Sequence, residues 1–151
     1  MTPAGDLRPV VGVGAVVWRG SRLLLIRRGR APLRGVWSLP GGRQGWGETV
    51  EAALRREVRE ETALELGPLT FVAVVDLLTP AAEGRPALHF TLLDYTAEAL
   101  AGEAVAGDDA EAVAWFDMAE VARLDLWSET RAVIHRAAEV RASAGQPSAG
   151  S

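Results

Sequence analysis

GRQGWGETVEAALRREVREETAL, residues 42–64 of the chain, is a glycine-rich turn that leads into a helix-favouring run. At about 100° per residue, the side chains of Glu57, Glu60 and Glu61 fall within one narrow arc of that helix. Carboxylates so close repel one another and disfavour the helix unless a positive charge lies between them. Hard divalent cations such as Mg²⁺ take oxygen ligands of this kind, usually together with substrate phosphates. A bound metal ion is therefore the simplest expectation for this helix face.

The spacing within this stretch resembles the Nudix box, whose pattern runs from a glycine through a Glu, an Arg-Glu pair and a Glu-Glu pair to an aliphatic residue. The matching residues are Gly42, Glu48, Arg56, Glu57, Val58, Glu60, Glu61 and Leu64. The departure is Ala63, where the family usually has a glycine that tolerates φ > 0. Alanine predicts a slightly different exit from the helix, with no ligand lost. The alternative interpretation is a solvated helix face with i,i+4 ion pairs.

The composition is that of one globular domain. The 151 residues are 48% hydrophobic and 24% charged, which is ordinary for such a domain. The chain has 16 Lys+Arg and 20 Asp+Glu, so it lacks the excess of basic residues that is typical of proteins that bind a nucleic-acid polymer. The absence of cysteine excludes disulfides, zinc-thiolate sites and thiol catalysis. The start has no apolar signal region, and no run approaches the ~18 apolar residues of a membrane span, so we expect a cytoplasmic protein that does not bind membranes.

The pattern along the chain predicts an α+β fold with a mixed sheet. Thr49 and Ser128 are the expected N-caps of two helices. We expect one domain over residues 10–141, a flexible N-terminus at 1–9 and a disordered tail at 142–151. The Nudix resemblance sharpens the fold to an αβα sandwich with the sheet between helices. The expected strands are 10–18, 23–26, 36–39, 69–78, 87–96 and 112–116, the first two as a hairpin, and the expected helices end near 62, 124 and 141.

The resemblance also implies the reaction and the metal. Nudix enzymes hydrolyse a nucleoside diphosphate linked to another moiety, with water attacking one phosphorus. By resemblance, Mg²⁺ or Mn²⁺ is the cofactor, Arg56 holds a box carboxylate in position, and Glu48 assists metal binding directly or through water. The implied catalytic residues are Arg56, Glu57, Glu60 and Glu61, and the implied metal ligands are the Gly41 carbonyl, Glu48, Glu57, Glu60 and Glu61.

A further acid often enters the family's site from a loop ahead of an aromatic strand residue. Asp109 lies at that sort of distance before Trp115, and Asp108 and Glu111 are its rivals. The general base stays open between Glu57 and an acid of residues 99–111. Two glycines and few large apolar groups in residues 101–110 predict a loop that is mobile without ligand.

Three further side chains are candidates for substrate binding. Arg27 and Arg28 end the second expected strand and point to opposite faces. Arginine forks match phosphate oxygens, and family position favours Arg28, with a solvated strand end as the alternative. Trp37 and Trp46 flank the Gly-Gly turn and could stack on a base, or pack against the core or its rim.

The substrate is the least determined feature. In the ADP-ribose pyrophosphatases of the family a proline commonly lies sixteen residues beyond the box, and Pro80 has that offset from Leu64. Proline is also common in such a loop. The favoured reaction is therefore ADP-ribose to AMP and ribose 5-phosphate. The alternatives are a nucleoside triphosphate, such as 8-oxo-dGTP, and a catalytically silent nucleotide-binding module. Whether the chain forms a homodimer stays open.

Overall fold

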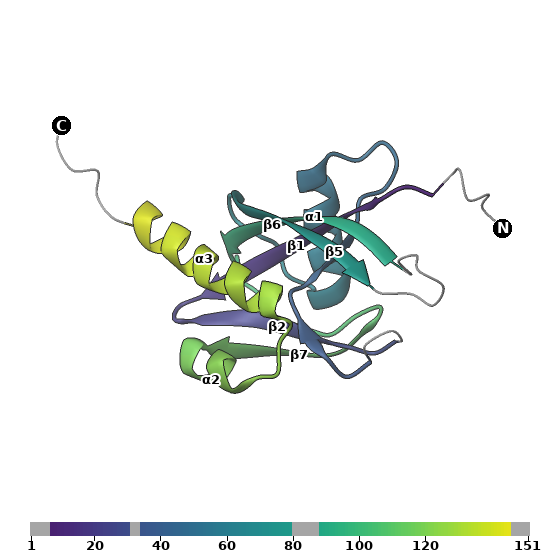
Figure 1. Ribbon diagram of the computed structural model, residues 1–151. Coiled ribbons are helices and arrows are strands. Elements are labelled where there is room, and N and C mark those ends of the chain that lie inside the picture. The colour runs from purple at the N-terminus through teal and green to yellow at the C-terminus, as the bar shows by residue number, and fades with distance from the viewer. Residues whose placement is uncertain (1–6, 31–33, 80–87, 146–151) are drawn as a thin grey trace.

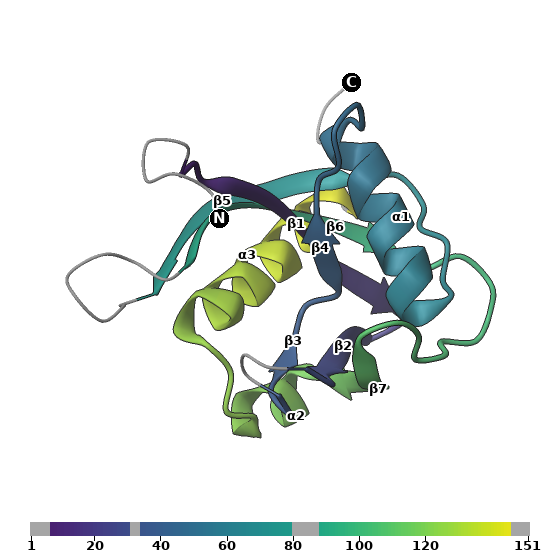
Figure 2. The ribbon, with the colours of Figure 1, turned by 90° about the vertical axis from the view of Figure 1, so that its right-hand side faces the viewer.

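A computed structural model describes residues 7–30, 34–79 and 88–145 of the chain (Figure 1). Helices lie on both sides of a sheet, with α1 on one side and α3 on the other (Figure 2). The strands are β1 (Val10–Arg19), β2 (Arg22–Arg28), β3 (Trp37–Ser38), β4 (Gly41–Arg43), β5 (Thr70–Thr79), β6 (Leu88–Glu98) and β7 (Ala110–Asp117). The helices are α1 (Val50–Thr62), α2 (Met118–Arg123) and α3 (Ser128–Ala144). The expected α+β sandwich is confirmed.

The sheet is mixed and branches at β1 and at β2. Its main path runs β3-β2-β1-β6-β5, while β4 pairs with β1 and β7 pairs with β2. The β1–β6 pair is parallel, and the others are antiparallel. The carboxyl end of β1 pairs with β2 through Trp18 and Leu23, whereas its amino half pairs with β4 through Val13 and Gly42. The β4 branch places Gly41 and Gly42 beside the second half of α1, next to Glu61 and Glu57.

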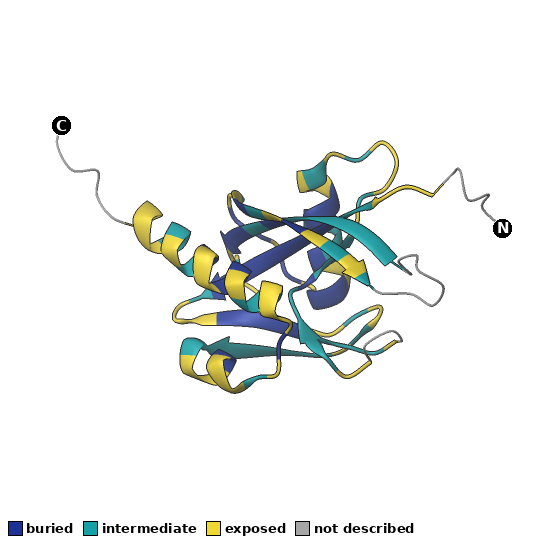
Figure 3. Cartoon of the chain, in the orientation of Figure 1, coloured by how far each residue is buried: buried dark blue, intermediate teal, exposed yellow. Residues whose placement is uncertain are grey.

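Alternation along β1 builds one core on each face of the sheet. Val13, Ala15 and Val17 point to the α1 side, where they join a cluster that contains Leu54 and Val58. The opposite face carries Val16 and Trp18, which pack with residues of α3. Figure 3 shows the same division, with the inward faces of the helices buried and the outer face of α3 exposed. The predicted inward residues of α3, Val133, Ile134 and Ala137, are buried.

The start of α3 differs from the expectation. Ser128 is the first helical residue, and Trp127 takes the N-cap position without a side-chain hydrogen bond. Leu126 is buried in the core on the α3 side, which fixes the chain just before the helix. The non-helical N-cap position is therefore taken by the next residue, Trp127. The helix runs to Ala144, three residues beyond the expected end at Arg141. The Thr49 cap of α1 is confirmed, because its side chain accepts a hydrogen bond from Ala52 N at 3.1 Å.

The exit from α1 also corrects an expectation. Ala63 adopts φ 64° and ψ 13°, which is the left-handed conformation that glycine allows, so alanine does not send the chain along a different exit. Its N–H donates to Arg59 O at 2.9 Å and the following Leu64 is 1% exposed. The capping bond and the burial of Leu64 offset the steric cost of the alanine Cβ.

Three sequence expectations fall outside the described residues: Pro80, the six N-terminal residues and the tail from residue 146 onward. Within the described ranges, no helix is long and apolar enough to cross a membrane.

Candidate active site

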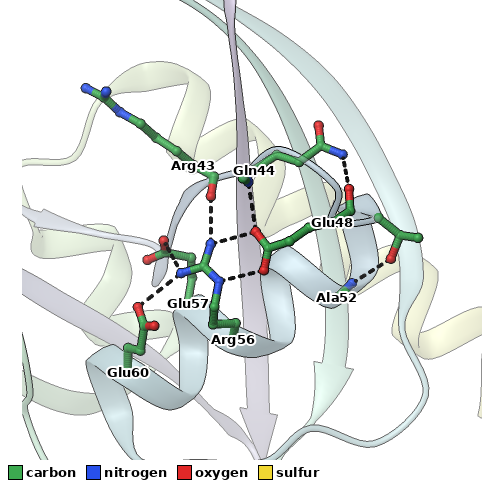
Figure 4. Close-up of polar contacts among 9 residues, drawn as sticks. Arg43, Gln44, Glu48, Ala52, Arg56, Glu57 and Glu60 are labelled. Carbon is green, nitrogen blue, oxygen red and sulfur yellow. Dashed lines mark hydrogen bonds and ion pairs between the residues drawn. The ribbon is translucent and has the colours of Figure 1, made fainter.

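Arg56 is the centre of a polar network at the start of α1 (Figure 4). Its Nε and Nη2 donate to the two carboxylate oxygens of Glu48 at 2.7 and 2.9 Å. Its Nη1 donates to Glu57 at 2.9 Å and to Glu60 at 3.1 Å, and Nη2 also reaches Arg43 O at 3.0 Å. One guanidinium therefore supplies the positive charge between three carboxylates. Arg56 thus relieves part of the repulsion for which the sequence suggested a metal ion, since it binds Glu57 and Glu60 but not Glu61.

Glu48 closes the turn between β4 and α1. Besides the contact with Arg56, its carboxylate accepts a hydrogen bond from Gly45 N at 2.8 Å. The hydrogen bonds from Arg56 and Gly45 favour the charged carboxylate and lower the pKa of Glu48 to about 2. The same pairing, led by Glu48, raises the pKa of Arg56. Glu48 is thus charged and already fully engaged by the protein.

Glu57 packs against the Gly-Gly turn. A Cβ built on Gly42 would lie 2.2 Å from the Glu57 carboxylate, so a larger residue here would require the Glu57 side chain to move. Burial raises the pKa of Glu57, with Arg56 acting in the opposite direction.

Glu61 is the most buried acid of the helix, with 7% of its surface exposed. Its Oε1 accepts a hydrogen bond from Gly41 N at 3.3 Å. Burial raises the pKa of Glu61 to about 8, aided by the negative charges of Glu57 and Asp109 and opposed by Gly41 N–H and Arg28. Ionising this buried carboxyl group is costly, and a bound cation would offset that cost.

A cavity of about 580 Å³ lies between these carboxylates and the ends of β2 and β3. The predicted residues Arg28, Gly41, Glu57, Glu60, Glu61 and Asp109 all line it, together with Ile26, Arg30, Ser38, Leu39, Gly42, Arg43 and Asp108. Five acidic and three basic side chains therefore face one space. Glu48 and Arg56 do not line the cavity and support it from behind.

The loop acids separate into two environments. Asp109 pairs with Arg30 Nε at 2.8 Å on the cavity side, where Asp108 also lies. Glu111 pairs with Arg27 at 3.4 Å and does not line the cavity. The opposite faces predicted for Arg27 and Arg28 are thus seen in the structure, with Arg28 on the cavity side.

Neither tryptophan candidate lines the cavity. Trp37 packs edge-on against Phe116, with ring centroids 5.1 Å apart. The guanidinium carbon of Arg27 lies over the Trp37 ring, 5.5 Å from its centroid. The packing alternative is therefore what the structure shows for Trp37. Trp46 lies on the turn before α1 and is fully exposed to solvent.

Arg30 and Arg43 line the cavity and were not among the sequence candidates. Arg30 follows Arg28 at the i+2 spacing that returns a side chain to the same face of an extended segment, and this signal could have identified it. Arg43 has no comparable signal, because its place depends on the pairing of β4 with Gly12 of β1.

The donor set of the cavity suits a hard divalent cation, since every acidic ligand candidate offers oxygen and Glu61 is buried with a raised pKa. As the side chains stand, no three acids or histidines of the described ranges converge closely enough to hold an ion. Arg56 Nη1 binds both Glu57 and Glu60. Binding a cation would therefore require the carboxylates that line the cavity to move closer together.

Comparisons with known proteins agree with this geometry. A family model described as the NUDIX domain matches residues 8–137. The chain is 33% identical over 118 residues to the ADP-ribose pyrophosphatase of Methanocaldococcus jannaschii, covering 78% of this chain and 68% of that protein. It is 40% identical over 122 residues to "Putative 8-oxo-dGTP diphosphatase 2" of Mycobacterium tuberculosis, covering 79% and 80%. The crystal structure of the MutT NUDIX hydrolase from Burkholderia pseudomallei matches with a TM-score of 0.76 at 37% identity, covering 86% and 98%. The chain belongs to the Nudix family of hydrolases.

Proposed function

We propose that this Nudix hydrolase is a divalent-metal-dependent pyrophosphatase that converts ADP-ribose to AMP and ribose 5-phosphate. The observation that carries the proposal is the charge pattern of the cavity, in which five acidic and three basic side chains line one space. A pyrophosphate group is itself an anion, so an acid-dominated cavity repels it. Cations must compensate that charge before the substrate can enter, and the arginines then have phosphate oxygens to bind.

Glu57, Glu60 and Glu61 would hold Mg²⁺ or Mn²⁺, with the Gly41 carbonyl as a further ligand. Glu48 would assist through water, because Arg56 and Gly45 N–H already bind its carboxylate and it does not line the cavity. When bound, such a cation supplies charge stabilisation at the reacting phosphoryl group and lowers the pKa of water. Arg56 sets the positions of Glu57 and Glu60 through its two Nη1 hydrogen bonds. A candidate for the general base is Glu57 or a loop acid. Asp108 and Asp109 both line the cavity, and Asp109 is favoured because its negative charge also acts on Glu61.

Arg28, Arg30 and Arg43 would bind the phosphates of the substrate. All three line the cavity, and a planar guanidinium matches phosphate oxygens with two parallel donors. Arg30 is paired with Asp109 in this structure, so an entering phosphate would exchange that partner for its own oxygens.

Two relatives support different substrates. The Methanocaldococcus jannaschii relative is named an ADP-ribose pyrophosphatase, which agrees with the offset of Pro80 from the box. The Mycobacterium tuberculosis relative is named for 8-oxo-dGTP and is the more identical of the two, so a nucleoside triphosphate is the second candidate. Neither Trp37 nor Trp46 lines the cavity, so stacking of a base on one of these tryptophans does not favour one of the two substrates over the other.

A nucleotide panel with Mg²⁺ and with Mn²⁺ tests the proposal. The expected result is release of AMP and ribose 5-phosphate, with kcat/KM for ADP-ribose well above the values for dGTP and 8-oxo-dGTP. A clear preference for a triphosphate with release of pyrophosphate would transfer the proposal to the second candidate. Binding of Mn²⁺ without hydrolysis of any nucleotide would point instead to a silent binding module. A cytoplasmic location stays a prediction, and whether the chain forms a homodimer stays open.

A further inference from the structure

The loop before β7 is docked on the carboxyl end of α1 through its main chain. Val105 N donates to Thr62 O at 2.8 Å, and Gly107 N donates to Glu61 O at 3.0 Å. The last carbonyls of a helix have no partner within the helix, so these two N–H groups satisfy acceptors that would otherwise be free. The mobility predicted for this loop is untested, but its described contacts anchor it to the metal-site helix.

Gly107 makes the closest approach in this contact. A Cβ built at Gly107 would lie 2.5 Å from Glu60 O, a main-chain atom that cannot rotate away. Gly107 is not among the residues with positive φ, so its backbone conformation is open to other residues. Glycine is therefore required here for space against the helix and not for its conformational freedom.

The residues after Gly107 are fixed at both ends. Gly107 O accepts a hydrogen bond from Ala110 N at 3.1 Å, and Asp109 O accepts one from Gly29 N at 2.8 Å. Between them, Asp108 takes φ 50°, a conformation that aspartate tolerates better than most residues. Asp108 and Asp109 line the same cavity as the carboxylates of α1. The main chain thus connects the loop acids directly to the peptide units of Glu60 and Glu61.

We propose that Gly107 is a positioning residue that sets the distance between Asp109 and the carboxylates of Glu60 and Glu61. The inference rests on the proposed function, because this distance matters for catalysis only if these acids share a bound cation. Replacing Gly107 with alanine forces the loop to move by roughly 1 Å, and a misplacement of this size can cost about 10²-fold in rate.

Gly107→Ala is the test variant, and Gly67→Ala is its matched control. The nearest atom to a Cβ on Gly67 is Glu98 O at 3.5 Å, an ordinary contact, so the same substitution there should be tolerated. We expect Gly107→Ala to lower kcat by at least ~10-fold with a smaller change in KM, and to weaken Mn²⁺ binding, measured by electron paramagnetic resonance without substrate, by a similar factor. Gly67→Ala should leave both values unchanged.

A double-mutant cycle with Asp109→Asn separates positioning from general damage. If Gly107 acts through Asp109, the double variant should be no slower than the slower single variant. Multiplied losses in the double variant, or wild-type kcat and Mn²⁺ binding in Gly107→Ala, would overturn the proposal. Should the wild type hydrolyse no nucleotide, the proposed function fails while the Mn²⁺ comparison still decides the role of Gly107.

Val105→Pro provides a second variant in case Gly107→Ala does not fold, as judged by circular dichroism. It removes the N–H that donates to Thr62 O, and the proline ring also fixes φ at residue 105. We expect weaker Mn²⁺ binding in this variant too, and unchanged binding would contradict the proposal.

Discussion

Arg56 and Glu48 form a two-pronged ion pair across the turn before α1. The guanidinium Nε and Nη2 atoms lie 2.7 and 2.9 Å from the two carboxylate oxygens. The remaining donors of Arg56 reach Glu57, Glu60 and Arg43 O. The arginine therefore fixes the turn and the carboxylates of Glu57 and Glu60 as one unit.

Arg56→Lys should lower kcat by at least ~10-fold and also lower the thermal midpoint. A lysine ammonium is a compact point charge and cannot reproduce the planar fork that serves several acceptors at once. Calorimetry and steady-state kinetics check the prediction. The control is Arg136→Lys on α3, whose single pair with Glu139 is solvent-exposed and should contribute little. An Arg56→Lys variant with wild-type turnover would show that the network does not position the carboxylates.

Ala63→Gly should stabilise the protein by about 0.5–1 kcal/mol, because glycine adopts the left-handed conformation without the steric cost of a Cβ. Part of the gain is lost to the greater freedom of glycine in the unfolded chain. The control is Ala132→Gly at an exposed interior position of α3, which should destabilise by about 1 kcal/mol. Denaturant unfolding of both variants measures the change in the free energy of unfolding, which should rise for Ala63→Gly and fall for Ala132→Gly. Destabilisation by both substitutions would contradict the assigned geometry of the helix exit.

The sequence supported the box, its helix and the two-faced sheet, because these depend on local spacing and hydrophobic alternation. The resemblance placed Arg56 against a box carboxylate, but it did not show that this carboxylate is Glu48, because the contact depends on how the turn folds back over the helix. The approach of Gly107 to Glu60 joins segments distant in sequence and leaves no periodic signal. The exposure of Trp46 likewise depends on how the turn projects from the domain. Tertiary contacts, and not residue type, decided each of these features.

Asp109→Asn should slow turnover by at least ~10-fold, as expected for a mispositioned catalytic group or a lost outer ligand. Asp108→Asn and Glu111→Gln should have much smaller effects. Glu111 provides a sharp comparison because it pairs with Arg27 and does not line the cavity. The kcat values of the three variants at matched Mg²⁺ decide the assignment. A damaging Glu111→Gln together with a silent Asp109→Asn would mean that the wrong acid has been chosen.

Asp94 should make the folded protein less stable as the pH rises. This carboxyl lies on β6 against Gly14 of β1, with 6% of its surface exposed. Burial raises the pKa of Asp94 from 3.8 to about 6, so between these pH values the folded state binds a proton that the unfolded chain has lost. The resulting loss of stability begins near the unfolded pKa and is complete above the folded pKa.

Asp94→Asn is therefore expected to raise the thermal midpoint relative to wild type at pH 8 and to have a much smaller effect at pH 4. Thermal unfolding of both proteins across this range, with a chelator present, measures the difference. A difference that does not grow with pH would show that ionised Asp94 carries no burial cost.

The most direct test of the metal-dependent mechanism is the turnover of Glu61→Gln on the best substrate of the nucleotide panel at saturating Mg²⁺. Glu61 combines deep burial, a cavity-facing position and a pKa raised to about 8. Loss of this ligand should lower kcat by several orders of magnitude, while circular dichroism stays that of the wild type. Near wild-type turnover in Glu61→Gln would contradict the assignment of the α1 carboxylates to a catalytic cation.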